Sequence, residues 1–109
     1  MNDFDLAHFA AAVHDRAPGW ETADVQWQLT IGPTRDKSAA WVTCEDARRV
    51  IQLTVWTSGE AELDVGDLAS GTTASVHYDL ATSEDLAACL DDLTQHFAKQ
   101  VRCTTRPIP

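Results

Sequence analysis

The sequence predicts a single α+β domain in which a helix, five antiparallel strands and a second helix follow one another. Apolar residues recur with a helical period of about 3.6 residues in residues 3–17 and again in residues 83–99. Between these segments, five short stretches alternate apolar and polar residues and are separated by short polar turns, which is typical of an antiparallel meander. Each helix has one apolar stripe and the sheet has one apolar face, so we expect both helices to pack on the same face.

The first helix, residues 3–17, has an apolar stripe that is formed by Leu6, Phe9, Ala10, Val13 and Ala17. Asn2 or Asp3 is a suitable N-cap. Pro18 and Gly19 follow, and since neither residue continues a helix well, we expect the helix to end there.

The predicted strands are residues 24–31, 39–44, 49–57, 60–67 and 73–80. The first places Val25, Trp27, Leu29 and Ile31 on one face, and the third places Ile51, Leu53 and Val55 on the core face. In the second helix, residues 83–99, the apolar stripe is Leu86, Leu90, Leu93 and Phe97, with Thr82 or Ser83 as N-cap. The domain is expected to span residues 1–101, followed by an extended tail over residues 102–109.

The stretch VWTSGEAELDV, residues 55–65, predicts a hairpin whose register can be tested by where its apolar residues fall. A two-residue turn would place Val55 opposite Glu62. A three-residue loop that ends at Gly59 instead places Val55 opposite Ala61 and keeps every inward position apolar. We prefer the second register, which turns Trp56 and Glu60 to the outward face.

The same reasoning on the next hairpin places Leu63 opposite Tyr78, so that Glu62 faces Asp79 and Asp64 faces His77. If Val42 packs inward opposite Ile51, Trp41 also points outward, beside Gln52. The residues predicted to bind a partner are therefore Trp41, Trp56, Glu60, Glu62, Asp64, His77 and Asp79. Like charges directly opposite each other destabilise a sheet, and aromatic residues ringed by charge are typical of interfaces. The alternative is an ordinary solvated face.

Charge narrows the class of partner. Eight basic and seventeen acidic residues give a net charge of −9. This charge disfavours nucleic-acid binding, which needs clustered Lys and Arg. It suits a protein partner with a basic surface, although acidic surfaces also simply keep proteins in solution. With no apolar run near the roughly 20 residues of a membrane span, and no signal-peptide pattern, we expect a cytoplasmic protein that binds no membrane.

Searches for catalytic and metal-binding patterns give no candidate site. The sequence has no GxGxxG, GxxxxGK[ST], HExxH, GxSxG or CxxC motif, and DVGDLASG lacks the acidic spacing of a calcium loop. His77 with Asp64 and Asp79 is a possible acid–base group, but a flat sheet face has no cleft that would exclude water. Cys44 and Cys89 are expected in or near the core, and Cys103 completes an odd set. We therefore predict a protein that is not an enzyme and has no cofactor and no metal.

Residues 49–93 resemble the small immunity proteins called the TriTu family. The resemblance rests on a strand that ends Val-Trp-x-Ser-Gly, here Val55, Trp56, Ser58 and Gly59. An alternating acidic strand follows, then a strand that ends with His77, Tyr78 and Leu80, and then a helix that opens with Ser83, Asp85 and Leu86. The resemblance implies a non-enzymatic cytoplasmic protein that neutralises a cognate toxin of a bacterial polymorphic toxin system.

The first hypothesis is thus a monomeric immunity protein whose acidic face, with Trp41 and Trp56 as anchors, caps a basic toxin surface. The alternative is a small acidic secretion chaperone or adaptor, which would be a homodimer and would bind an extended segment of its client. The mass in solution separates these two hypotheses. A third, an enzyme or ligand-binding domain, would need a deep pocket that no motif demands.

Overall fold

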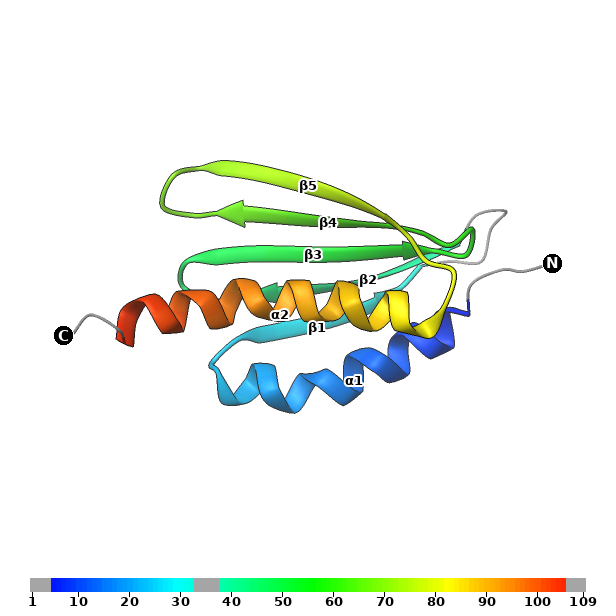
Figure 1. Ribbon diagram of the computed structural model, residues 1–109, viewed down its shortest axis with the longest axis horizontal. Helices are drawn as coiled ribbons and strands as arrows, with labels where there is room; N and C mark the ends of the chain where they lie inside the picture. Colours follow the sequence, from blue (N-terminus) through cyan, green and yellow to red (C-terminus); the bar gives the residue numbers. More distant parts are fainter. Residues whose placement is uncertain (1–4, 33–37, 106–109) are drawn as a thin grey trace.

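The order of elements is the predicted one. In the computed structural model, the backbone is described for residues 5–32 and 38–105, and side chains are described as far as residue 97. The elements are α1 (Leu6–Thr22), β1 (Gln26–Ile31), β2 (Ala39–Glu45), β3 (Arg49–Trp56), β4 (Glu60–Asp67), β5 (Thr72–Asp79) and α2 (Ser83–Thr105) (Figure 1). The chain is therefore an α+β fold with one five-stranded sheet.

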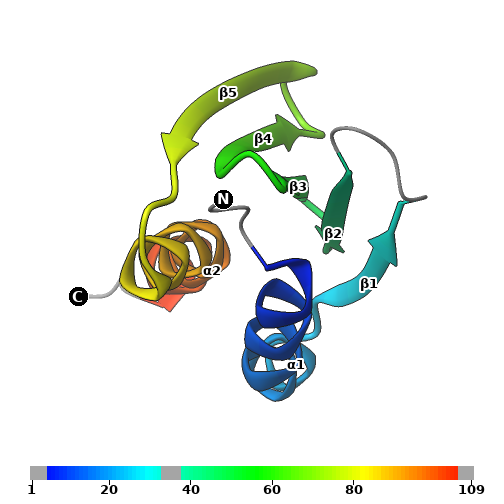
Figure 2. The same ribbon diagram turned by 90° about the vertical axis from the view of Figure 1, so that its right-hand side faces the viewer.

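The strands lie in sequence order, β1-β2-β3-β4-β5, and every neighbouring pair is antiparallel. The sheet curls, and both helices lie on its concave side, α1 below β1 and α2 nearer β5 (Figure 2). The expectation that both helices pack on one face is confirmed. In the part of the chain that the structure describes, no helix covers the opposite face, which we call the open face.

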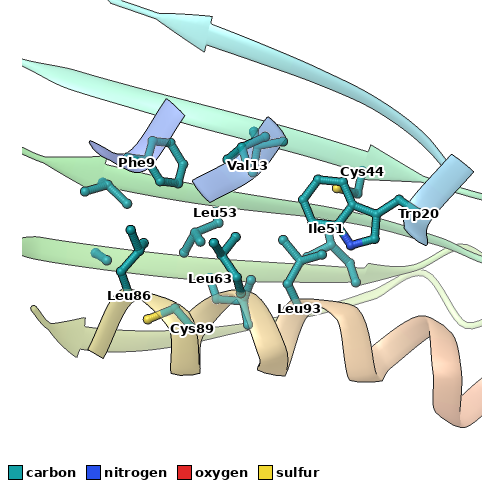
Figure 3. Packing of buried hydrophobic residues seen from close by; sticks show 14 of the residues in the cluster. Phe9, Val13, Trp20, Cys44, Ile51, Leu53, Leu63, Leu86, Cys89 and Leu93 are labelled. Carbon is teal, nitrogen blue, oxygen red and sulfur yellow. The ribbon is translucent and has the colours of Figure 1, made fainter. Parts of the chain in front are cut away.

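A single apolar core fills the space between the helices and the sheet. Phe9 and Val13 of α1 and Leu86, Cys89 and Leu93 of α2 point toward the strands (Figure 3). The strands contribute residues from alternate positions, among them Val42, Cys44, Ile51, Leu53, Val55, Ala61 and Leu63. Full burial of one large aliphatic side chain contributes about 1.5–3 kcal/mol, so this cluster supplies the main stabilisation of the domain.

The first helix is longer than predicted. Asp5 is its N-cap and accepts a hydrogen bond from the N–H of Ala7 (2.9 Å); Asn2 and Asp3, the expected caps, lie outside the described residues. The helix continues through Pro18 and Gly19 to Thr22, so the predicted end is wrong. The missing N–H of Pro18 is offset because the extra turn brings Trp20 into the core, where it is 2% exposed.

The end of α1 is set by two backbone hydrogen bonds. The N–H of Val25 donates to the carbonyl of Trp20 (2.9 Å), and the N–H of Asp24 donates to the carbonyl of Glu21 (3.1 Å). These are the bonds of a Schellman motif, in which the first residue after the helix cap, here Asp24, must be left-handed. Asp24 takes that conformation with φ 67°. Aspartate tolerates it better than most residues, although a glycine is the usual choice.

The second helix begins with a reciprocal cap. The N–H of Asp85 donates to Thr82 Oγ1 (3.2 Å), and Asp85 Oδ2 accepts from the N–H groups of Ala81 (2.8 Å) and Thr82 (3.1 Å). Thr82 is thus the N-cap, one of the two residues predicted. The helix continues to Thr105, so residues 102–105 are helical where an extended tail was expected. Residues 106–109 lie outside the described residues.

Candidate functional site: the open face of the sheet

The hairpin between β3 and β4 has the predicted register. Val55 pairs with Ala61, Leu53 with Leu63 and Ile51 with Val65. Gly59 closes the loop with φ 95°, and its N–H donates to the carbonyl of Trp56 (2.9 Å). The alternation along the two strands therefore places Trp56 on the open face, together with Glu60, Glu62 and Asp64.

The hairpin between β4 and β5 is shifted by two residues from the prediction. Leu63 pairs with Val76 rather than Tyr78, and Glu62 pairs with His77 rather than Asp79. A shift of two residues leaves every side chain on its predicted face, because the strand period is two. It does change the neighbours: Asp64 faces Ser75, and the two carboxylates that face each other are Glu60 and Asp79.

The shift comes from the loop after β4. Asp67 Oδ1 accepts hydrogen bonds from the N–H groups of Ala69 (3.0 Å) and Ser70 (3.3 Å), and the Asp67 carbonyl accepts from the N–H of Gly71 (2.8 Å). Gly71 has φ 75°. These bonds close a loop of residues 68–71 between Asp67 and Thr72, which pair with each other, whereas the predicted register would place Leu68 opposite Thr73.

On β2 the predicted face is correct and the predicted partner is wrong. Val42 is buried but pairs with Leu53 instead of Ile51, which pairs with Cys44. Trp41 lies on the open face and pairs with Thr54. Its ring also covers Gly32: a Cβ on Gly32 would lie 3.4 Å from Trp41 Cζ3. Trp41 therefore packs against its own sheet, an aromatic cover over a glycine that has no side chain of its own.

All seven predicted residues thus lie on one face of the sheet. Trp41, Trp56, Glu60, Glu62 and Asp64 are half-buried, whereas His77 and Asp79 are exposed. The large apolar side chains that are most exposed among the described residues lie elsewhere: Ile31, Leu68 and Val76.

Two polar contacts on the open face link neighbouring side chains of β4 and β5. Ser75 Oγ donates to Asp64 Oδ1 (2.6 Å). His77 Nε2 lies 3.4 Å from Asp79 Oδ1, and these side chains are 58% and 87% exposed, so solvent screens their attraction. Since Asp64 bonds Ser75 instead of His77, the possible acid–base group of His77, Asp64 and Asp79 is not assembled as predicted.

On the described strands, the charged side chains of the open face other than His77 are carboxylates. None of the outward-facing positions of β1–β5 holds Lys or Arg. Two arginines make polar contacts on the helix side of the sheet. Arg16 forms an ion pair with Asp91 between the two helices (2.6 Å), and Arg49 Nη1 donates to the carbonyl of His96 (3.0 Å). The carboxylates of β4 and β5 therefore make the described strand positions of this face acidic.

The described residues give little support to metal binding, to a reactive thiol or to a membrane-spanning helix. They contain no cluster of three or more His, Cys, Asp or Glu residues placed to hold a metal ion. Burial raises the pKa of the Cys44 and Cys89 thiols to about 12, so both stay protonated core residues. Among the helices of the described residues, none combines the length and apolarity needed to cross a membrane.

Comparison with known proteins agrees with the resemblance noted in the sequence and extends it. The model of the family described as "Immunity protein TriTu" matches residues 8–96, from α1 to α2. The match includes residues 8–48, which the resemblance did not cover. A search of curated proteins found no match. The chain belongs to the TriTu family of immunity proteins.

Proposed function

We propose that this protein neutralises a cognate bacterial toxin domain by binding it, without catalysis, through the acidic open face. Membership of an immunity-protein family supports a toxin partner in general. The observation that carries the assignment of the face is its charge: Glu60, Glu62, Asp64 and Asp79 lie together, and no Lys or Arg shares the outward strand positions.

A basic toxin surface would complement this face. Opposite potentials raise the encounter rate and reject partners of the wrong charge. The expected partner is thus a toxin protein with a basic surface, bound by a cytoplasmic monomer.

The tryptophans serve as apolar anchors among the carboxylates. Trp56 is half-buried at the end of β3, beside the loop that leads to Glu60. Tryptophan is over-represented among the residues that dominate binding energy, and surrounding polar residues exclude water from it. Trp41 has a second role, because its ring covers Gly32. The experiment that tests the proposal substitutes Trp56.

The proposal is tested with the double variant Trp56→Ala, Glu62→Lys. We expect its affinity for the cognate toxin domain to fall at least tenfold, about 1.4 kcal/mol, while its melting temperature stays near that of the unchanged protein. Calorimetric titration measures the affinity, and thermal unfolding measures the stability.

The matched control is Asp15→Lys, which makes the same charge change on an exposed position of α1, in the helix layer. This control should bind the toxin domain as the unchanged protein does. An unchanged affinity in the folded double variant would contradict the assignment of the face.

A further inference from the structure

The strand β5 is an outer edge of the sheet that lacks the usual protection. In the described part of the chain no strand lies beyond it. Natural edge strands are commonly protected by Lys, Pro, a bulge or a covering helix. The sequence of β5, TTASVHYD, has neither Lys nor Pro, and nearly all its residues are exposed. An exposed edge of this kind is a template for another strand.

The register of β4 and β5 determines which backbone groups of β5 can form hydrogen bonds with an added strand. Leu80 donates its N–H to the carbonyl of Gly59 (2.7 Å), so residues of the same parity, Tyr78, Val76 and Ala74, direct their backbone groups to β4. The intervening residues direct their N–H and C=O groups to the outer edge. They are Thr73, Ser75, His77 and Asp79, whose side chains lie on the open face.

The other face of β5 borders a groove. The groove has a volume of about 330 Å³ and lies between β5 and α2, lined by Leu63, Val76, Tyr78, Asp92, Gln95 and His96. Val76 is 48% exposed there. Tyr78 Oη donates to Asp92 Oδ2 (2.8 Å). An extended segment paired with β5 would therefore meet apolar surface on the helix side and carboxylates on the open side.

We propose that the toxin adds one strand to β5, and that this strand alternates basic and apolar side chains. This inference rests on the proposed function and specifies how the partner docks. Basic side chains of the added strand would lie on the open face, near Asp79. Apolar side chains would lie on the helix side, against Val76. Main-chain hydrogen bonds supply affinity in this mode, and the alternate side chains supply specificity.

Charge decides between the possible occupants of the edge. A second copy of this chain would bring another net charge of −9 to the same edge, and that repulsion opposes self-pairing. A cationic toxin segment has the opposite sign and is attracted to the carboxylates of the neighbouring open face. The occupant is therefore a toxin strand and not a second β5.

Residue-resolved hydrogen exchange on the unchanged protein tests the proposal without any variant. In the free protein, the outward amides of Thr73, Ser75, His77 and Asp79 should exchange faster than those of Ala74, Val76 and Tyr78. Addition of the cognate toxin domain should slow the outward amides at least tenfold, which removes the alternation. Outward amides that keep their free rates in the saturated complex would overturn the proposal.

A pair of variants at one position gives an independent readout. Ser75→Pro removes an outward N–H, and proline is tolerated on an edge where that group faces solvent. Ser75→Ala removes the same hydroxyl contact with Asp64 and keeps the N–H. We expect Ser75→Pro to bind the toxin domain at least tenfold more weakly than Ser75→Ala. If Ser75→Pro fails to fold, the exchange measurement alone decides.

Three further outcomes separate this inference from the function on which it rests. If Ser75→Pro binds as Ser75→Ala does while Trp56→Ala, Glu62→Lys is weakened, strand addition is wrong and the proposed function stands. If the unchanged protein does not bind the toxin domain, both fail. Outward amides protected without toxin, together with a dimeric mass in solution, would identify a second copy as the occupant and overturn the inference.

Discussion

Individual tryptophans serve different purposes in this small domain. Trp20 is buried in the core, and its indole Nε1 donates to Thr94 Oγ1 (2.9 Å), whose hydroxyl donates to the carbonyl of Leu90 (2.8 Å). Trp27 donates to Glu21 Oε2 (2.8 Å) and packs edge-on against Trp20. These two hold α1 to the rest of the fold. Trp41 and Trp56 lie on the open face, where we propose that they contact the toxin.

The contact between Trp20 and Thr94 yields a stability prediction. Thr94→Val keeps the shape of the side chain but leaves the indole N–H without its acceptor. We expect a loss of about 1–3 kcal/mol in the free energy of unfolding, the usual penalty for an unpaired buried donor. Thr94→Ser keeps the hydroxyl, loses only a methyl group, and should cost about 0.8 kcal/mol. Chemical denaturation measures both. A Val variant as stable as the Ser variant would show that this bond is unimportant.

The sequence predicts the face on which a residue lies correctly where the alternation of a strand or the period of a helix alone determines that face. The faces of Val42, Trp41 and Trp56 follow from a period of two and are correct. Trp20 was missed as a core residue because Pro18 and Gly19 are strong local signals for a helix end. Burial of a large aromatic side chain outweighed those signals, and such a tertiary effect has no local signature.

At the scale of elements, the strand order and one hairpin register were predictable, and the other register was not. Of the two turns considered for the hairpin of β3 and β4, only the loop of residues 57–59 keeps every inward position apolar. For β4 and β5, the predicted and the observed register both keep side chains on the same faces. The hydrogen bonds of the Asp67 carboxylate in the loop favour the observed register of β4 and β5. The pairing of residues on the open face therefore depended on turn chemistry more than on hydrophobic pattern.

The cap of α2 makes stability depend on pH. The hydrogen bonds from the N–H groups of Ala81 and Thr82 hold the pKa of Asp85 below its ordinary value of 3.8. A lowered carboxyl pKa stabilises the folded state above that ordinary value, and the stabilisation is lost as the pH falls through the folded-state pKa. Acid unfolding should therefore include a contribution from this one side chain.

Asp85→Asn tests that contribution. The amide oxygen of the variant can still accept a hydrogen bond, but it carries no charge and does not titrate. We expect the variant to be less stable than the unchanged protein at pH 7 and to lose less stability between about pH 5 and pH 2. Unfolding curves across this range measure both. Parallel stability curves for the two proteins would refute the role of Asp85.

At the scale of the whole molecule, the described part of the chain has a helix-covered face of the sheet and an open face (Figure 2). The helices cover the concave face of the sheet and complete the core, and Arg16 and Arg49 make their contacts on that side (Figure 2). Among the described elements no helix covers the open face, and its charged strand positions other than His77 are acidic. A charged sheet face can change without disturbing the core, so a binding surface there can adapt to a particular toxin while the fold stays the same.

The most direct test of this account is protection of living cells. Bacteria that produce the cognate toxin domain should grow when they also produce the unchanged protein or Asp15→Lys. They should fail to grow with Trp56→Ala, Glu62→Lys at an equal level of folded protein. Full protection by that double variant would contradict the claim that the acidic, tryptophan-containing open face neutralises the toxin.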